Sequence, residues 1–361
     1  MLKCLFAHIY LWVIELNNAI KIVFRFLAAT TVAILFAVKP QASSQGARQA
    51  LELCFSTVIP SLFPFMTVSG YILNCDMLSV LGKRSERLCR FLFDLPKEAG
   101  MIFVMSMLGG FPVGASLIDD SVQKGRLTLN QARRMLLFCV NPGPAFVINI
   151  VGVSMLGSQR AGVIILVSLF LSSLITGIIS RIFKHGEESR HFSTSSDTDS
   201  PLILSVKKSI SAIIGVCGWI VIFSAFLGVI NSFSLNETAK QWLNMLAEVT
   251  VGCGISAKSF PLPITVLLLG WSGVCVHLQL MPCISACKLK YKHFAVARIF
   301  NGVVGMGISR VLFRIFPCEA EVFSNAGEIL PRAVSISVPA TAGLLFLSAL
   351  MILDLAPKRK V

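Results

Sequence analysis

Long apolar stretches follow one another along nearly the whole chain. A helix needs about 20 mostly apolar residues to cross a hydrocarbon layer of roughly 30 Å. With 55% hydrophobic and 14% charged residues, the chain also has more apolar surface than one aqueous core can bury. The stretches lack the alternation of barrel strands, and backbone groups in lipid must be paired within their own segment. The sequence therefore predicts an all-α, polytopic helix bundle in a cell membrane.

Ten segments are expected to enter the bilayer. They are residues 22–38, 50–73, 99–118, 135–156, 161–183, 202–230, 243–259, 261–284, 295–316 and 333–353. Between the fifth and the sixth, the chain is polar and rich in Ser, Thr and Asp, as a linker is. The predicted organisation is an N-terminal membrane anchor (1–48), a first repeat (49–183), the polar linker (184–201), a second repeat (202–316) and a C-terminal transmembrane helix with a basic tail (317–361).

The net charge of +14 comes from Lys and Arg in short loops beside the apolar spans. This placement indicates topology rather than a nucleic-acid surface, because cytoplasmic loops of membrane proteins are enriched in these residues. Three groups are therefore predicted to be cytoplasmic, which places the C-terminus inside. They are Lys83, Arg84, Arg87, Arg90 and Lys97; Lys288, Lys290, Lys292 and Arg298; and Lys358, Arg359 and Lys360.

The charge pattern makes residues 99–118 unusual, because basic segments flank them on both sides. Both ends then belong inside, which predicts a re-entrant hairpin rather than a crossing. Its bend is expected at residues 109–114, where glycines permit unusual φ angles and Pro112 lacks a backbone donor. The next span starts at a capping box formed by Thr128 and Gln131. It is interrupted at residues 141–144, Asn-Pro-Gly-Pro, which no continuous helix would carry.

The second half predicts the same order of elements with the opposite orientation. Residues 202–230 leave the cytoplasm, and residues 243–259, with Gly-Cys-Gly at 252–254 in the middle, dip in from outside. A span at 261–284 follows, interrupted at residues 270–273. Each half therefore contains a full span, a re-entrant hairpin, a broken span and a full span. Two such inverted repeats are typical of transporters, whose binding site lies near the midplane between broken helices.

Four strings carry a resemblance to known proteins: IPSLFPFM at 59–66, GGFPVGASLIDD at 109–120, FCVNPGPAFVI at 138–148 and SGVCVHLQ at 272–279. They resemble the YlbJ-type sporulation integral membrane proteins. That type belongs to the nucleoside-recognition (Gate) domain family, which is related to concentrative nucleoside transporters and to the membrane part of the ferrous iron transporter. The resemblance covers roughly residues 50–314, and Pro142 departs from it, since a small residue is expected there. It implies a membrane protein of spore-forming bacteria that is needed for spore cortex formation.

The candidate substrate-binding residues lie at the hairpins and the breaks: Gly109, Gly110, Pro112, Gly114, Asn141, Gly143, Glu248, Ser272, His277 and Gln279. Each has a structural alternative. The glycines can serve close helix packing, and Asn141 can cap the half-helix it interrupts. Glu248 is functional or paired if it lies at membrane depth, but merely solvated if its helix is interfacial. His277 can be a hydrogen-bonded core residue, and no second ligand near it suggests a metal site.

Hydrolase, P-loop and dinucleotide-binding motifs are missing from the sequence, so we expect neither an enzyme nor a cofactor. The leading hypothesis is a transporter-like protein that binds or moves a small polar, nucleoside-like solute by alternating access. The alternative is a non-transporting membrane scaffold that acts in sporulation through membrane protein partners. An open midplane pocket would favour the first hypothesis, and a dry core with every polar atom paired would favour the second.

Overall fold

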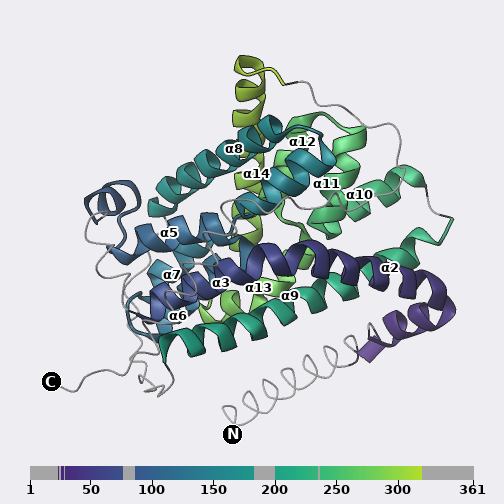
Figure 1. Ribbon diagram of the computed structural model, residues 1–361, viewed down its shortest axis with the longest axis horizontal. Helices are drawn as coiled ribbons and strands as arrows, with labels where there is room; N and C mark the ends of the chain where they lie inside the picture. Colours follow the sequence, from purple (N-terminus) through teal and green to yellow (C-terminus); the bar gives the residue numbers. More distant parts are fainter. Residues whose placement is uncertain are drawn as a thin grey trace, which may run out of the picture.

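The computed structural model describes residues 23, 26–27, 29–75, 86–182, 200–234 and 236–318. The first residues of the predicted anchor, most of the linker, the C-terminal span and its basic tail lie outside this part. Every regular element of the described part is helical, and Figure 1 shows the helices gathered into one bundle. Five helical stretches are long and apolar enough to cross a membrane: Pro40–Ile72, Gln159–Ile182, Pro201–Asn231, Leu262–Ala286 and Tyr291–Ile315. The expected polytopic helical membrane protein is confirmed at this level.

The first half begins with α2 (Pro40–Leu53), a π-helical segment (Cys54–Val58) and α3 (Ile59–Asn74), which run on without a gap. The helix starts at Pro40, ten residues before the predicted start of this span at residue 50. Proline is well suited to the first position of a helix, where its missing N–H would have no helical partner in any case. The other elements of this half are α5 (Glu98–Gly109), α6 (Phe111–Gln123), α7 (Leu129–Leu136), a second π-helical segment (Ala145–Met155) and α8 (Gln159–Ile179).

The second half consists of α9 (Pro201–Asn231), α10 (Glu237–Ala247), α11 (Val249–Ser259), α12 (Leu262–Trp271), α13 (Gly273–Ala286) and α14 (Tyr291–Ile315). In the bundle α9 packs along α2 and α3, while α14 packs on α8 and α12. The order of elements thus matches that of the first half: a long helix, two short helices, an interrupted helix and a closing helix. That the halves are inverted repeats, and that the short helices re-enter the membrane, stay predictions.

The chain reverses direction between α5 and α6, as the glycine pattern predicts. Gly110 has a φ of +84°, and a Cβ placed on Gly114 would lie 2.7 Å from the Cβ of Ser106. Two residues eight positions apart approach so closely only if the two helices fold back on each other. Residues 98–123 therefore form a helical hairpin with its tip at Gly110.

The second hairpin, α10 and α11, has its tip at Glu248, and the prediction that placed residues 252–254 at its middle is wrong. The Glu248 carboxylate accepts a hydrogen bond from the Val251 N–H at 2.7 Å, so it caps α11 and fixes where that helix starts. Gly252 is helical and packs against Met245. The rings of Trp242 and Phe260, near the free ends of the hairpin, lie 5.6 Å apart.

Both predicted interruptions are present. The capping box of Thr128 and Gln131 starts α7 as expected, and α7 ends at Leu136, well before Pro142. In the second half Ser272 separates α12 from α13, and the φ angles of Ser272 and of Gly273, the first residue of α13, are +77° and +78°. Two consecutive positive φ angles redirect the chain, which leaves backbone groups of both half-helices without their usual partners.

Several basic loops meet at one end of the bundle, which we call the basic end. Arg133 Nε donates to the Cys287 carbonyl at 2.9 Å, and Lys124 Nζ donates to Asn74 Oδ1 at 2.8 Å. Arg134 is buried at this end. Its guanidinium donates to the carbonyls of Phe93, Asp94 and Ser180, and this pairing compensates for its loss of water.

At the opposite end Asn231 and Asn244 exchange hydrogen bonds of 3.2 and 2.8 Å, which joins the C-terminus of α9 to α10. The ammonium of Lys39 lies 5.7 Å from the ring centroid of Phe233. The open ends of the first hairpin therefore lie at the basic end, and those of the second lie at the opposite end.

Candidate functional site

The two hairpin tips meet at one cavity inside the bundle. Its volume is about 70 Å³, which is smaller than the roughly 300–1,000 Å³ of small-molecule sites, so the cavity is nearly closed in this conformation. The hairpins contribute Gly110, Phe111 and Pro112, and Glu248, Val249 and Thr250. The interruptions contribute Pro142, Gly143 and Phe146, with Val276 and Gln279 from α13. Thr57, Val58, Ser61 and Leu62, and Val216 and Ile220 of α9, complete the wall.

Each hairpin tip packs against the interruption of its own half. A Cβ on Gly110 would lie 3.3 Å from the Gly143 nitrogen, and one on Gly273 would lie 3.0 Å from the Val249 nitrogen. Such short distances require glycine at both places, because any side chain would push the tip away from the interruption. The same contact occurs once in each half, and together the two contacts frame the cavity.

Glu248 is the charged side chain of the cavity wall, and only 2% of it is exposed. One carboxylate oxygen accepts the Val251 N–H, so the first turn of α11 stabilises negative charge at this position. No Lys or Arg of the described residues lies within ion-pair distance of it. Its burial excludes the alternative of a solvated interfacial glutamate, since a group this buried must be paired or serve a function.

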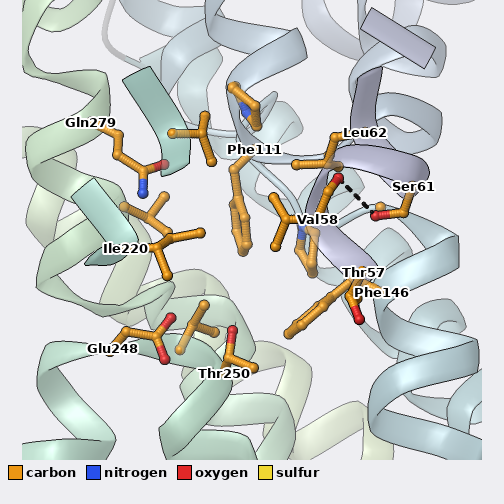
Figure 2. A pocket seen from close by; sticks show the side chains of 17 residues that line it. Thr57, Val58, Ser61, Leu62, Phe111, Phe146, Ile220, Glu248, Thr250 and Gln279 are labelled. Carbon is orange, nitrogen blue, oxygen red and sulfur yellow. Dashed lines mark hydrogen bonds between the residues drawn. The ribbon is translucent and has the colours of Figure 1, made fainter. Parts of the chain in front are cut away.

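The remaining polar groups of the cavity surround a mostly apolar space, and Figure 2 shows their directions. Glu248 and Thr250 lie at one side, Gln279 lies above them, and Thr57 and Ser61 lie on the wall across the cavity. The rings of Phe111 and Phe146 project between these groups. A few polar groups around an apolar interior are typical of sites for small organic molecules.

Asn141 is buried but lies outside the cavity wall. Its amide nitrogen donates to the Phe138 carbonyl at 2.7 Å, and its oxygen accepts the Ser173 hydroxyl at 2.7 Å. Asn301 of α14 donates to the same Ser173 Oγ at 3.1 Å. The side chain thus ties the end of the first half-helix to α8 and, through Ser173, to α14, which agrees with the capping alternative.

His277 is also buried and outside the wall. Its Nδ1 lies 3.1 Å from Tyr291 Oη, and its Nε2 lies 2.8 Å from the Trp271 carbonyl oxygen. That carbonyl belongs to the last residue of α12, so the imidazole satisfies a group that the interruption leaves without a helical partner. These contacts favour the core-residue alternative for His277.

Arg298 lies near the site, but the sequence analysis had assigned it to a loop. The charge pattern predicts it in a cytoplasmic loop, but it lies within α14 and is 0% exposed. One guanidinium nitrogen donates to the Val140 carbonyl before the first interruption, and the other donates to Ser272 Oγ at 2.8 Å within the second. No carboxylate of the described residues pairs with it, and its Nε has no partner there. Arg298 therefore joins the two interruptions to each other.

Five of the ten predicted residues, Gly110, Pro112, Gly143, Glu248 and Gln279, line the cavity together. The other five, Gly109, Gly114, Asn141, Ser272 and His277, lie outside its wall and support the hairpin or the interruptions. Sequence reasoning missed Thr57, Ser61, Phe111, Phe146 and Thr250. The only signal for Thr57 and Ser61 was their polarity inside an apolar span near Pro60 and Pro64, and Phe111 lies between the predicted Gly110 and Pro112.

Comparison with known proteins gives one relationship that covers most of the chain. The sequence is 23% identical to the sporulation integral membrane protein YlbJ of Bacillus subtilis (strain 168), over 78% of this chain and 78% of that protein. No family model matches the chain. No solved structure matches it either.

The similarity extends well beyond the four strings from which the resemblance was inferred. It agrees with the run of apolar helices, five of which are long enough to cross a membrane. Over most of its length the chain is therefore similar to a sporulation integral membrane protein of the YlbJ type.

Proposed function

We propose that the protein binds a small, polar, nucleoside-like solute in the cavity between the two hairpin tips, and moves it across the membrane by alternating access. Under this proposal the two halves are inverted repeats, and the hairpins are re-entrant. The setting is spore cortex formation, as the resemblance to the YlbJ type implies.

The observation that carries the proposal is the meeting of both hairpin tips, the first interruption and α13 at one cavity with a buried carboxylate. Glu248 lies at a tip, is almost fully buried, and has no cationic partner among the described residues. A buried ionisable group inside a membrane protein is costly unless it is paired or functional. A ribose hydroxyl or a base amino group would donate to the carboxylate, and Phe111 and Phe146 offer apolar surface to a planar base.

A ligand screen by thermal shift on the detergent-purified chain tests the proposal. The panel consists of uridine, cytidine, adenosine, guanosine, their bases, and amino acids of similar size. A ligand that binds only the folded state stabilises it by about 2.7 kcal/mol at one hundred times its Kd. We expect at least one nucleoside to raise the melting temperature, and Glu248→Gln to remove this rise while the protein stays folded.

Glu52→Gln is the matched control, because Glu52 is an exposed carboxylate on α2 that does not line the cavity. This variant should keep the ligand-induced rise. A rise that survives Glu248→Gln, or a panel without any rise, would contradict binding at this cavity.

The scaffold alternative has one observation in its favour. The Asn141, Ser173 and Asn301 network and the His277 contacts are internal, so these polar groups serve the fold. A scaffold would retain its partners in sporulating cells when the cavity is filled. Val276→Trp, which places a large side chain in the cavity wall, should therefore leave sporulation intact if the scaffold alternative is correct.

A further inference from the structure

A second cavity lies further along the helices that wall the first. Its volume is about 30 Å³, and it is lined by Met66, Ser69 and Gly70 of α3, Val113, Ser116, Leu117 and Asp120 of α6, and Ser205, Lys208, Ser209 and Ala212 of α9. Four serines and one ion pair make this wall more polar than that of the first cavity. Its residues lie nearer the basic end on each of the three helices.

Only a thin apolar layer separates the two cavities. On α3, Leu62 lines the first cavity and Met66 the second, and on α9 Val216 lines the first and Ala212 the second. Each of these pairs is one helical turn apart, or about 6 Å along the axis. On α6 the neighbouring residues Pro112 and Val113 face different cavities. A layer of this thickness can block a polar solute because a hydrophobic constriction excludes water.

The second cavity is closed at the basic end by polar bridges between α9 and the first half. Lys208 Nζ and Asp120 Oδ1 form an ion pair of 3.0 Å, which joins α9 to α6. Asn74 donates to Ser205 Oγ at 2.8 Å and accepts from Lys124 Nζ at 2.8 Å, which joins α3, α9 and the segment after α6. The Lys208 side chain is 42% exposed, so the ion pair is weak and little free energy is needed to break it.

We propose that the two cavities are successive stations of one solute route between α3, α6 and α9, and that the Asp120–Lys208 pair is the gate at its basic end. This proposal rests on the proposed function, because a route needs a solute to move. In the conformation described here the apolar layer and the gate are both closed. Opening requires the first turns of α9 to separate from α6 and α3, which breaks both bridges together and leaves the serines as hydrogen-bonding groups for the passing solute.

Thiol accessibility tests the gate without any solute. Ser61→Cys, in the first cavity, is introduced into a variant whose eleven native cysteines are replaced by alanine. A membrane-impermeant thiol reagent is applied from the side that the basic end faces. Lys208→Asp places two carboxylates in contact at the gate, and we expect it to raise the labelling rate at position 61 about fivefold or more. The exchanged pair, Asp120→Lys with Lys208→Asp, should restore the slow rate.

Lys292→Asp is the matched control, since Lys292 is an exposed lysine at the basic end that lines neither cavity. It should leave the labelling rate unchanged. If Lys208→Asp does not fold, Asp120→Asn removes the attraction without repulsion and should raise the rate about threefold. An unchanged rate in a folded gate variant, or an equal rise in the Lys292→Asp control, would overturn the gate. Because the assay contains no solute, such a failure is distinct from a failed ligand screen.

Discussion

At the scale of single residues, the buried polar groups divide into two kinds. Asn141, His277 and Arg298 satisfy backbone groups that the interrupted helices leave unpaired, so they preserve the shape of the site. Glu248 also caps a helix, but it does so from the cavity wall. From polarity and sequence position alone, Asn141, His277 and Glu248 were all candidate site residues. The difference lies in which atoms their side chains reach, and that depends on long-range packing.

Arg298 offers the clearest prediction at this scale. Its planar guanidinium donates from two separate nitrogens to the Val140 carbonyl and to Ser272, which one ammonium group cannot do with the same geometry. Arg298→Lys should therefore leave a buried acceptor unsatisfied and cost about 1–3 kcal/mol of stability. A lower melting temperature of the purified protein would show this loss.

Arg310→Lys is the control for this substitution, because Arg310 lies on an exposed face of the same helix. Its melting temperature should match that of the unchanged protein. Equal melting temperatures for both variants would mean that Arg298 does not hold the two interruptions together.

At the scale of elements, the sequence predicted the chain reversal near Gly110 and both interruptions correctly, because glycine and proline act locally on the backbone; that the hairpin re-enters the membrane stays a prediction. Gly110 and Gly273 adopt positive φ angles and Pro142 lacks a backbone donor, so each of them interrupts a helix through its own backbone. The tip of the second hairpin was placed wrongly, because an acidic residue such as Glu248 has no strong local signal as a cap inside an apolar run. Glycines such as Gly252 are instead used for helix contact, which the sequence alone does not distinguish from a bend.

Two glycines on the arms of the hairpins allow a direct comparison. A Cβ on Gly114 would lie 1.9 Å from the Cys139 carbonyl oxygen, whereas one on Gly254 meets nothing within 4 Å. Gly114→Ala should destabilise the protein by about 1–3 kcal/mol through overpacking. Gly254→Ala should be neutral or stabilising by up to about 1 kcal/mol, because alanine favours a helix over glycine. Melting temperatures of the two variants, measured side by side, check the pair; equal losses would contradict the hairpin packing.

At the scale of the whole molecule, two basic segments that the charge pattern assigned to one side, near Arg133 and near Cys287, meet at one end of the described residues, and the side of the membrane that this end faces stays a prediction. The charge pattern indicates which loops share one side, because the positions of Lys and Arg in short loops are set by how the chain inserts into the membrane and not by how its helices pack. It misled at Arg298, since a count of Lys and Arg does not separate loop cations from cations that bind buried carbonyls. The cavity itself could not be foreseen from local patterns, because its wall combines residues from both halves of the chain.

The orientation prediction is tested by labelling single cysteines in the cysteine-free variant. Lys290→Cys lies at the basic end and Thr238→Cys at the opposite end, and both positions are exposed. We expect an impermeant thiol reagent to label position 238 in intact cells, and position 290 only after the cells are opened. Labelling of position 290 in intact cells would reverse the assigned orientation.

The bond between Arg298 and Val140 also has a consequence for biosynthesis. Its partners are 158 positions apart, so the ribosome completes the first interruption long before it makes the donor. Arg298 lies in the first third of α14, and an arginine in an inserting helix is costly at the translocon, by up to about 2.5–3.5 kcal/mol at the helix centre. The α14 segment has the lowest mean hydropathy of the five candidate spans, at 1.4. Late insertion of α14 against the earlier helices would lower this cost, because the Val140 carbonyl then accepts a hydrogen bond from the arginine. Assembly of the first half would therefore be complete only when α14, the last described helix, has inserted.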